Sequence, residues 1–473
     1  MIMTQTHPDL SRRLAGGDDN APAILAPDRP TLTHGGLRAL IAATATQLHA
    51  LGIGRGDRVA IVLPNGPEMA TAFIAVAAAA STAPLNPAYR ADELDFYLTD
   101  IGAKAILVAE TETGPAVTVA ERLGIAVLRL VVQPDAPAGS FIIEGAAVGP
   151  QASTRHIGAT LGLTAGDRCL NIMPLFHIHG LIAAVLSSLA SGGGIYCTPG
   201  FNALRFFQWL SEAKPSWYTA VPTMHQAILA RAARNAEALG AARLRFIRSS
   251  SASLPAQVMA ELEATFGCPV IESYGMTEAA HQMASNRLPP GLRKPGSVGA
   301  AGGPEVAVMA PDGRLMQAGE TGEIVIRGPN VTSGYEKNPD ANATAFAHGW
   351  FHTGDQGVLD GDGYLKVTGR LKEIINRGGE KISPLEVDDV LMDHPAVAQV
   401  VTFAMPHDKL GEEVAAAVVL REGMSATEGD IRAHAATRLA DFKVPRKVLI
   451  LDEIPKGATG KLQRIGLAAK LGL

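Results

Sequence analysis

The segment 273–278 (SYGMTE) places an aromatic ring, a glycine, a hydroxyl and a carboxylate within one short stretch of the chain. It follows the apolar run 268–271, which is typical of a buried strand. Ligands of open α/β sheets bind beyond the carboxyl ends of the strands. There a flat ring can stack on a planar ligand, a glycine allows close backbone approach, and a carboxylate can bind Mg²⁺. A strand-to-loop turn with a solvated glutamate is the structural alternative for this segment alone.

Further segments combine polar groups with glycines: 350–355 (WFHTGD), 369–373 (GRLKE), 376–383 (NRGGEKIS) and 455–461 (PKGATGK). Asp355, which ends the first of these segments, directly follows a glycine, as the ribose-binding acid of nucleotide sites does. The arginine of the second could donate charge-assisted bonds to a ribose or phosphate oxygen. The last two are glycine-rich loops with lysines. Taken singly, each also fits a structural role: a turn aspartate, a salt bridge, a solvated turn and a solvated tail.

The elements that must position these segments follow two alternating patterns. Apolar runs of strand length are separated by stretches of helical periodicity, which predicts parallel α/β structure. The expected elements are strands at 59–63, 83–85, 103–108, 216–221, 244–249 and 269–273, with helices at 67–79, 91–101 and 224–236. The Ala-rich run 69–83 is expected to be a buried helix, because it closes at a proline and is too short to span a bilayer.

The pattern changes beyond residue 291, where short strands with turn signals predict a β-rich lobe. It changes again near residue 370, which predicts a small α+β domain from there on. The expected elements after 291 are strands at 306–309, 323–327, 398–403, 413–420 and 447–451, with helices at 384–392 and 426–439.

The composition indicates a protein with a large apolar core and a small-molecule partner. The 473 residues are 47% hydrophobic and 18% charged, which suits two domains and excludes a disordered chain. A net charge of -5 gives no electrostatic footprint for nucleic acid or an anionic membrane. The cysteines at 169, 197 and 268 lack metal-ligand spacing, and residues 1–13 lack the apolar core of a signal peptide. We expect a cytoplasmic protein.

Taken together and in order, the five segments resemble the adenylate-forming superfamily, which includes acyl-CoA synthetases, peptide-synthetase adenylation domains and luciferases. The resemblance covers residues 57–464. It implies an α/β fold with a large N-terminal domain, 1–370, of two α/β layers and a distorted β-barrel. A small α+β domain, 371–473, would move and carry the lysine that acts in adenylation.

The resemblance implies an adenosine site made of a stacking tyrosine, its neighbouring backbone, and an acid and an arginine on the ribose hydroxyls. Its residues are Ser273, Tyr274, Gly275, Asp355 and Arg370. Thr277 would contact phosphate, and Glu278 would hold the Mg²⁺ that accompanies ATP. In the first half-reaction a carboxylate attacks the α-phosphate of ATP and forms an acyl-adenylate and pyrophosphate. Lys461 would stabilise the charge that develops there.

The second half-reaction transfers the acyl group to CoA. The resemblance implies that the small domain swings about Lys372 and withdraws Lys461. A loop would then line a tunnel for the pantetheine arm, and its residues are Gly378, Gly379, Glu380 and Lys381.

The substrate segments around residues 177, 250 and 281 look like the oxalate:CoA ligase branch. A small diacid requires donors or cations at the floor of its pocket, and the expected ones are His177, Ser250, Ser251 and His281. Structural histidines are the alternative for both imidazoles.

One part of the family pattern is missing. A Ser/Thr/Gly-rich loop that ends in Pro-Lys-Gly and binds the β- and γ-phosphates is expected between residues 147 and 155, and the sequence has no such loop. A natural deletion, an engineered deletion and an omitted segment all remain open. The expected function is therefore an ATP-dependent acyl-CoA synthetase, and the alternative is a half-active or non-catalytic adenylate-binding homologue. A peptide-synthetase domain or luciferase is disfavoured because the pocket segments differ.

Overall fold

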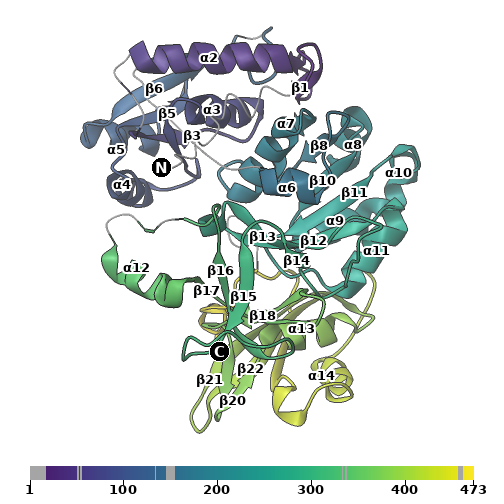
Figure 1. Ribbon diagram of the computed structural model, residues 1–473. Helices are drawn as coiled ribbons and strands as arrows, with labels where there is room; N and C mark the ends of the chain where they lie inside the picture. The colour runs from purple at the N-terminus through teal and green to yellow at the C-terminus, as the bar shows by residue number, and fades with distance from the viewer. Residues whose placement is uncertain are drawn as a thin grey trace. The chain divides into compact units, whose positions relative to one another are not determined.

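A computed structural model of the chain describes residues 17–50, 53, 56–133, 135–144, 155–332, 334–335, 338–455 and 462–473 (Figure 1). It divides into two units. The first comprises Met1–Thr219 and Asn235–Ile247, and the second comprises Ala220–Arg234 and Arg248–Leu473. The fold class is α/β, as the sequence predicts.

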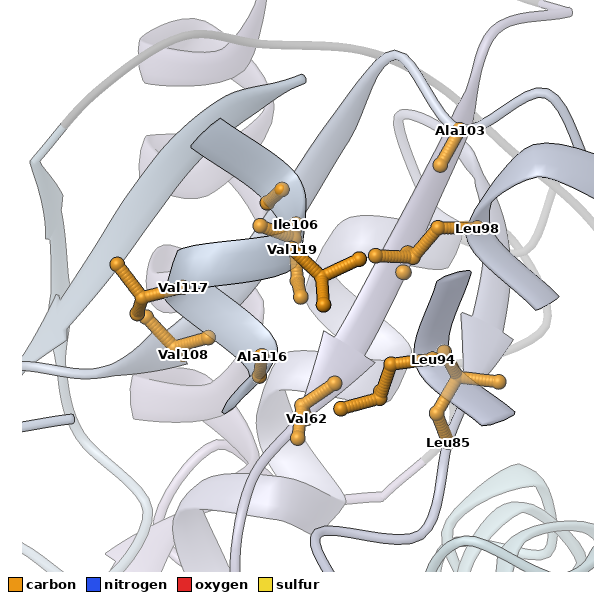
Figure 2. Packing of buried hydrophobic residues seen from close by; sticks show 12 residues of the cluster. Val62, Leu85, Leu94, Leu98, Ala103, Ile106, Val108, Ala116, Val117 and Val119 are labelled. Carbon is orange, nitrogen blue, oxygen red and sulfur yellow. The ribbon is translucent and has the colours of Figure 1, made fainter. Parts of the chain in front are cut away.

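The first unit contains a sheet with the strand order β4-β3-β5-β6-β7, parallel except for β7. Its strands are β3 (Arg58–Val62), β4 (Ser81–Pro84), β5 (Ala105–Ala109), β6 (Ala126–Val131) and β7 (Ile142–Glu144). The accompanying helices are α2 (His34–Ala50), α3 (Pro67–Ala77), α4 (Ala91–Asp100) and α5 (Pro115–Arg122). Side chains from β3, β5, α4 and α5 gather into one buried cluster (Figure 2). The predicted alternation of strands and helices is confirmed here. The run 69–83, expected to be one buried helix, forms a buried helix only as far as Ala77, and its last three residues belong to β4, which pairs with β3.

A second group of strands in this unit has the order β10-β8-β9-β1-β2. These strands are β1 (Pro22–Leu25), β2 (Leu32–Thr33), β8 (Arg168–Asn171), β9 (Gly194–Cys197) and β10 (Trp217–Ala220). The helical segments between them are α6 (Arg155–Thr160), a π-helical stretch (His179–Leu186), α7 (Ser187–Ala190) and α8 (Phe206–Ala213), and α10 (Ala236–Ala241) follows β10 along the chain.

The second unit begins with strands in the order β11-β12-β13-β14 and with two helices. The elements are α9 (Pro222–Ala232), β11 (Phe246–Ser250), α11 (Ala256–Phe266), β12 (Val270–Met276), β13 (His281–Ser285) and β14 (Ala300–Ala301). Segment 273–278 lies at the C-terminal end of its strand, as the sequence predicts, but β12 runs to Met276, three residues beyond the predicted end at residue 273. Antiparallel pairing with β13 extends it. A Cβ on Gly275 would lie 1.4 Å from the carbonyl oxygen of His281, so only glycine permits this close approach.

The β-rich lobe is an open antiparallel sheet with the order β15-β16-β17-β18, and the described residues contain no closed barrel. Its strands are β15 (Glu305–Met309), β16 (Thr321–Arg327), β17 (Phe351–Leu359) and β18 (Leu365–Arg370), and α12 (Pro339–Ala345) precedes β17. Its core is a cluster of Ala284, Val298, Val308, Ile324 and Leu365.

The C-terminal part of this unit has the strand order β20-β19-β22-β21, with β23 beside β22. Its elements are β19 (Ile375–Arg377), β20 (Glu380–Ile382), α13 (Pro384–Met392), β21 (Val397–His407), β22 (Gly411–Leu420), α14 (Glu428–Ala436), β23 (Lys447–Ile450) and α15 (Leu467–Lys470). Ser383 caps α13 through the N–H of Glu386, and Pro384 suits its first turn. These are the α+β elements expected after residue 370. The domain boundary at 370/371 stays a prediction.

Within the described residues, no helix is both long and apolar enough to cross a membrane.

Candidate active site

The second unit contains a cavity of about 590 Å³. Residues from distant parts of the sequence line it, and several of them belong to the predicted adenosine site: Ser273, Tyr274, Gly275, Asp355 and Arg370. The sequence segments that resemble a nucleotide site are therefore brought together around one space.

Asp355 is the centre of a hydrogen-bonded group in this cavity. The phenol of Tyr274 donates to its Oδ2 at 2.6 Å, and Nε of Arg370 lies 3.0 Å from its Oδ1. Arg370 faces Asp355 because β17 and β18 pair these two residues. A glycine with positive φ precedes each of them, Gly354 at 72° and Gly369 at 154°. The pairing register and the two glycines together set the direction of both side chains.

The electrostatics of this group follow from burial. Asp355 is only 5% exposed, and burial raises its pKa, although the Tyr274 phenol and the Arg370 guanidinium favour the ionised form. Burial and the neighbouring carboxylate raise the pKa of Tyr274 well above its usual range. The phenol is thus a donor and Asp355 an acceptor, and an acceptor of this kind can bind the hydroxyls of a ribose.

Tyr274→Phe is expected to weaken AMP binding by roughly 0.5 to 1.5 kcal/mol, or about two- to tenfold, because the ring predicted to stack on adenine stays while the hydrogen bond to Asp355 is lost. That bond lowers the pKa of Asp355, so its loss raises the pKa and Asp355 protonates at higher pH. As the pH falls, the variant should lose AMP affinity before the unaltered protein does. Calorimetry over a pH series measures this.

Tyr364→Phe is the matched control for this experiment. The Tyr364 phenol donates to the carbonyl of Leu292 at 2.7 Å, away from Asp355. If both variants bind AMP alike at every pH, the Tyr274 hydroxyl does not orient Asp355 for the predicted contact with ribose.

Thr277 and Glu278 begin a 3₁₀ turn directly after β12. The phenol of Tyr335 donates to Oε1 of Glu278 at 3.0 Å, and the Thr332 N–H donates to the Glu278 carbonyl at 2.7 Å. Asn342 in turn holds the backbone of Tyr335 through two bonds of 2.7 Å. The sequence reasoning did not identify Tyr335, because nothing in its local sequence indicates a partner 57 residues away.

A single oriented carboxylate fits Mg²⁺, which proteins commonly hold through one or two carboxylates together with substrate phosphates. No group of three or more acidic, histidine or cysteine side chains among the described residues is arranged as a metal site. Glu278 is accordingly the candidate ligand.

The predicted substrate residues differ in whether they line the cavity. Ser251 lines the cavity. The hydroxyl of Ser250 is buried and donates to the Ser273 carbonyl at 2.8 Å, and His281 is 2% exposed. His177 belongs to the first unit, where its Nδ1 accepts the backbone N–H of His179 at 3.3 Å.

Arg248 is a buried cation that sequence reasoning missed. It lies on β11 with no exposed surface, and its Nη2 is 3.5 Å from Nδ1 of His281. Its place before the predicted serines 250 and 251 could have signalled it, since an arginine in an apolar strand is uncommon.

The residues predicted for the second half-reaction lie apart from the cavity lining. Gly378 and Gly379 form the turn of the β19–β20 hairpin with φ of 59° and 101°, which explains a glycine pair there. The predicted loop before a helix is therefore a hairpin that includes Glu380 and Lys381. Lys372 lies just beyond β18. Lys461 and the region expected to hold the phosphate loop, 145–154, lie outside the described residues.

The family models agree with this geometry. The one described as AMP-binding enzyme matches residues 11–156 and 145–336, and the one described as AMP-binding enzyme C-terminal domain matches 386–461. The chain belongs to the AMP-binding enzyme family and is an AMP-forming acyl-CoA synthetase, a class that uses ATP and CoA.

Its similarity to known proteins extends over most of the chain. It is 44% identical to the oxalate–CoA ligase of Arabidopsis thaliana, over 92% of each chain. It is 36% identical to the oxalate–CoA ligase of Saccharomyces cerevisiae, over 87% of this chain and 86% of the relative. The crystal structure of ATP-bound MatB from Rhodopseudomonas palustris matches with a TM-score of 0.85 and 28% identity, over 96% of this chain and 97% of that one.

The matches also bear on the missing loop. The AMP-binding model matches in two segments that meet at residues 145–156. The alignment with the Arabidopsis ligase runs over 474 positions, more than the 92% of this chain that it covers, so that relative has residues without a counterpart here. The first observation supports the prediction that a family segment is missing near residue 150, and the second agrees with a missing segment without locating it.

Proposed function

We propose that this synthetase joins oxalate to CoA. The observation that carries the proposal is the similarity to two proteins named oxalate–CoA ligase, at 44% and 36% identity over most of the chain. The reaction would proceed through oxalyl-adenylate, with release of pyrophosphate in the first step and of AMP in the second.

The adenylation step asks the protein for positioning and charge stabilisation rather than covalent chemistry. Tyr274, Asp355 and Arg370 would hold the nucleoside, with Ser273 and Gly275 supplying backbone beside the ring. Thr277 would contact phosphate. Glu278, oriented by Tyr335, would bind Mg²⁺, which neutralises phosphate charge when it is present. Lys461 would face the attacking carboxylate and the α-phosphate.

The choice of a diacid is supported by the charge near the predicted substrate residues. Arg248 is a wholly buried cation beside His281, and Ser251, three residues further along the chain, lines the cavity. Neither Arg248 nor His281 is part of the cavity lining, so this charge would favour an anionic ligand at a distance rather than by direct contact. The two carboxylates of oxalate are bonded directly to each other, so a second negative charge lies beside the reacting carboxylate. A monocarboxylate lacks this second charge.

His281→Ala should lower kcat/KM for oxalate far more than for acetate, because only the diacid has a distal charge. Losing one charge-assisted bond would cost roughly 1.5 to 3 kcal/mol, or about ten- to a hundredfold. His281 has φ of 83°, where alanine is strained, so the ratio of the two substrates rather than the absolute rate is the measurement.

His281→Asn is the matched variant, because asparagine tolerates positive φ and keeps a hydrogen-bond donor. It should lose less oxalate selectivity than His281→Ala does. An equal loss for both acids in both variants would mean that His281 is structural, and oxalate would no longer be the favoured substrate.

For the second half-reaction we infer that rotation about Lys372 brings the hairpin of Gly378, Gly379, Glu380 and Lys381 to the pantetheine arm of CoA. The mobile part would be 371–473. The alternative of a non-catalytic homologue has no support from relatives that are named as ligases. A separate prediction is that the absence of the phosphate loop lowers the turnover of ATP. ATP–pyrophosphate exchange with oxalate tests it.

A further inference from the structure

Strands β16 and β17 lie side by side in the β-rich lobe, and their register shifts at Asp355 (Figure 1). Glu323 and Val325 are two residues apart on β16, but their partners on β17 are four residues apart. Two surplus residues of β17 therefore form a bulge within 353–355. A bulge bends its strand and re-aims a side chain, and bulges are frequent beside active sites. The direction of the Asp355 carboxylate thus depends on the groups that hold this bulge.

The carboxylate of Glu323 binds two neighbouring parts of the bulged strand. Its Oε1 accepts the Gly354 N–H at 3.0 Å, and its Oε2 lies 2.9 Å from Nδ1 of His352. Nε2 of the same imidazole lies 3.2 Å from the Ala347 carbonyl oxygen, so the ring is held on both sides. Gly354 has φ of 72° and no partner in the register between β16 and β17. The Glu323 carboxylate therefore takes the place of a backbone acceptor for the Gly354 N–H.

A second side chain supports the bulge. Thr353 is 8% exposed, and its hydroxyl donates to the Ile324 carbonyl at 2.7 Å and accepts the Asp355 N–H at 3.1 Å. The Gly354 carbonyl accepts the Leu371 N–H at 2.9 Å. The backbone that leads into Asp355 is therefore bonded at three successive groups, and Glu323 binds the first of them.

Glu323 can stabilise the site only through this backbone. Asp355 lines the cavity, whereas Glu323 lies outside the cavity lining. The two carboxylates repel each other, because burial is the main cause of the raised pKa of Asp355 and the charge of Glu323 adds to it. A favourable effect of Glu323 must therefore come from its charge-assisted bond to the Gly354 N–H, which fixes the residue next to Asp355.

We propose that Glu323 is a positioning residue that aims Asp355 at the ribose hydroxyls of the nucleotide by holding the bulge at Gly354. The inference rests on the proposed function, in which Asp355 binds the ribose. An Asp355 carboxylate that is wrongly aimed would lower the affinity only for nucleotides that carry these hydroxyls. A general loss of structure would lower the affinity for every adenine nucleotide.

Glu323→Ala tests the proposal when the binding of AMP is compared with that of 2′,3′-dideoxy-AMP, which lacks both ribose hydroxyls. Calorimetry should show an affinity for AMP that is about three- to tenfold lower, and an affinity for the dideoxy nucleotide that stays within about twofold. Glu323→Gln should recover most of the loss, because its amide oxygen can still accept the Gly354 N–H. Equal loss for both nucleotides in folded Glu323→Ala would overturn the proposal in favour of a structural role.

Glu305→Ala is the matched control. Glu305 lies on β15 of the same sheet, where its Oε2 is 2.8 Å from Nη2 of Arg327, outside the cavity lining. Its loss should change the affinity for neither nucleotide. Thermal unfolding of each variant establishes that it is folded. If Glu323→Ala does not fold, Thr353→Val removes the second support of the bulge and should give the same selective loss. A folded Thr353→Val without that selective loss would then overturn the proposal.

Asp355→Ala separates this inference from the proposed function. It should lower the affinity for AMP more than the affinity for 2′,3′-dideoxy-AMP, and adding Glu323→Ala should cause no further loss. If Asp355→Ala leaves AMP affinity unchanged, the proposed ribose contact fails. If Asp355→Ala lowers it and Glu323→Ala does not, the inference fails while the proposed function stands. Losses that multiply in the double variant would mean that Glu323 acts independently of Asp355, which also overturns the inference.

Discussion

Lys461→Ala is expected to lower acyl-adenylate formation by a factor on the order of 10² or more, the effect of removing one preorganised donor from developing charge. Thioester formation from a supplied acyl-adenylate should remain largely intact, because in the proposed mechanism the small domain would withdraw this lysine before the thiol attacks. Measuring pyrophosphate exchange and thioester formation separately on the same preparation gives the two rates.

Lys470→Ala is the control for this prediction. Lys470 is exposed on α15 and its Nζ lies 3.4 Å from Gln463 Oε1, so its removal should leave both half-reactions unchanged. Equal loss of both half-reactions in Lys461→Ala would refute the division of labour between them.

Insertion of the family's phosphate loop after Ala152 is expected to raise kcat/KM for ATP by roughly a hundredfold, while AMP affinity stays as it is. In the proposed site Tyr274, Asp355 and Arg370 would hold the nucleoside in either chain, and only the loop would bind the β- and γ-phosphates. Two charge-assisted bonds at about 1.5 kcal/mol each account for that factor. Calorimetry with AMP and ATP, alongside a turnover assay, provides the measurement.

An insertion of equal length made of glycine and serine without the lysine is the matched control. It should recover part of the gain, because backbone N–H groups can still bind phosphate. Ordinary synthetase rates from the chain without any insertion would mean that another segment cradles the phosphates, and the interpretation of the gap would be wrong.

The sequence by itself determined the elements and the kind of chemistry, because both depend on local signals. Helix α13 was predicted at 384–392 and is found at Pro384–Met392, since a serine cap and a proline mark its start. The adenosine site was predicted from the resemblance that the five segments, taken in order, show to the adenylate-forming superfamily, since each segment taken singly also fits a structural role.

Only the tertiary structure decided which side chains meet. The Tyr274 phenol reaches Asp355 across 81 residues, and Tyr335 reaches Glu278 across 57. Neither contact has a local signal in the sequence, because each joins strands or turns that are far apart along the chain and meet only in the folded structure. The same reason applies to β12, which runs to Met276 because β13 pairs with it. It applies equally to the buried Arg248, whose stability depends on burial and on partners that folding brings into reach.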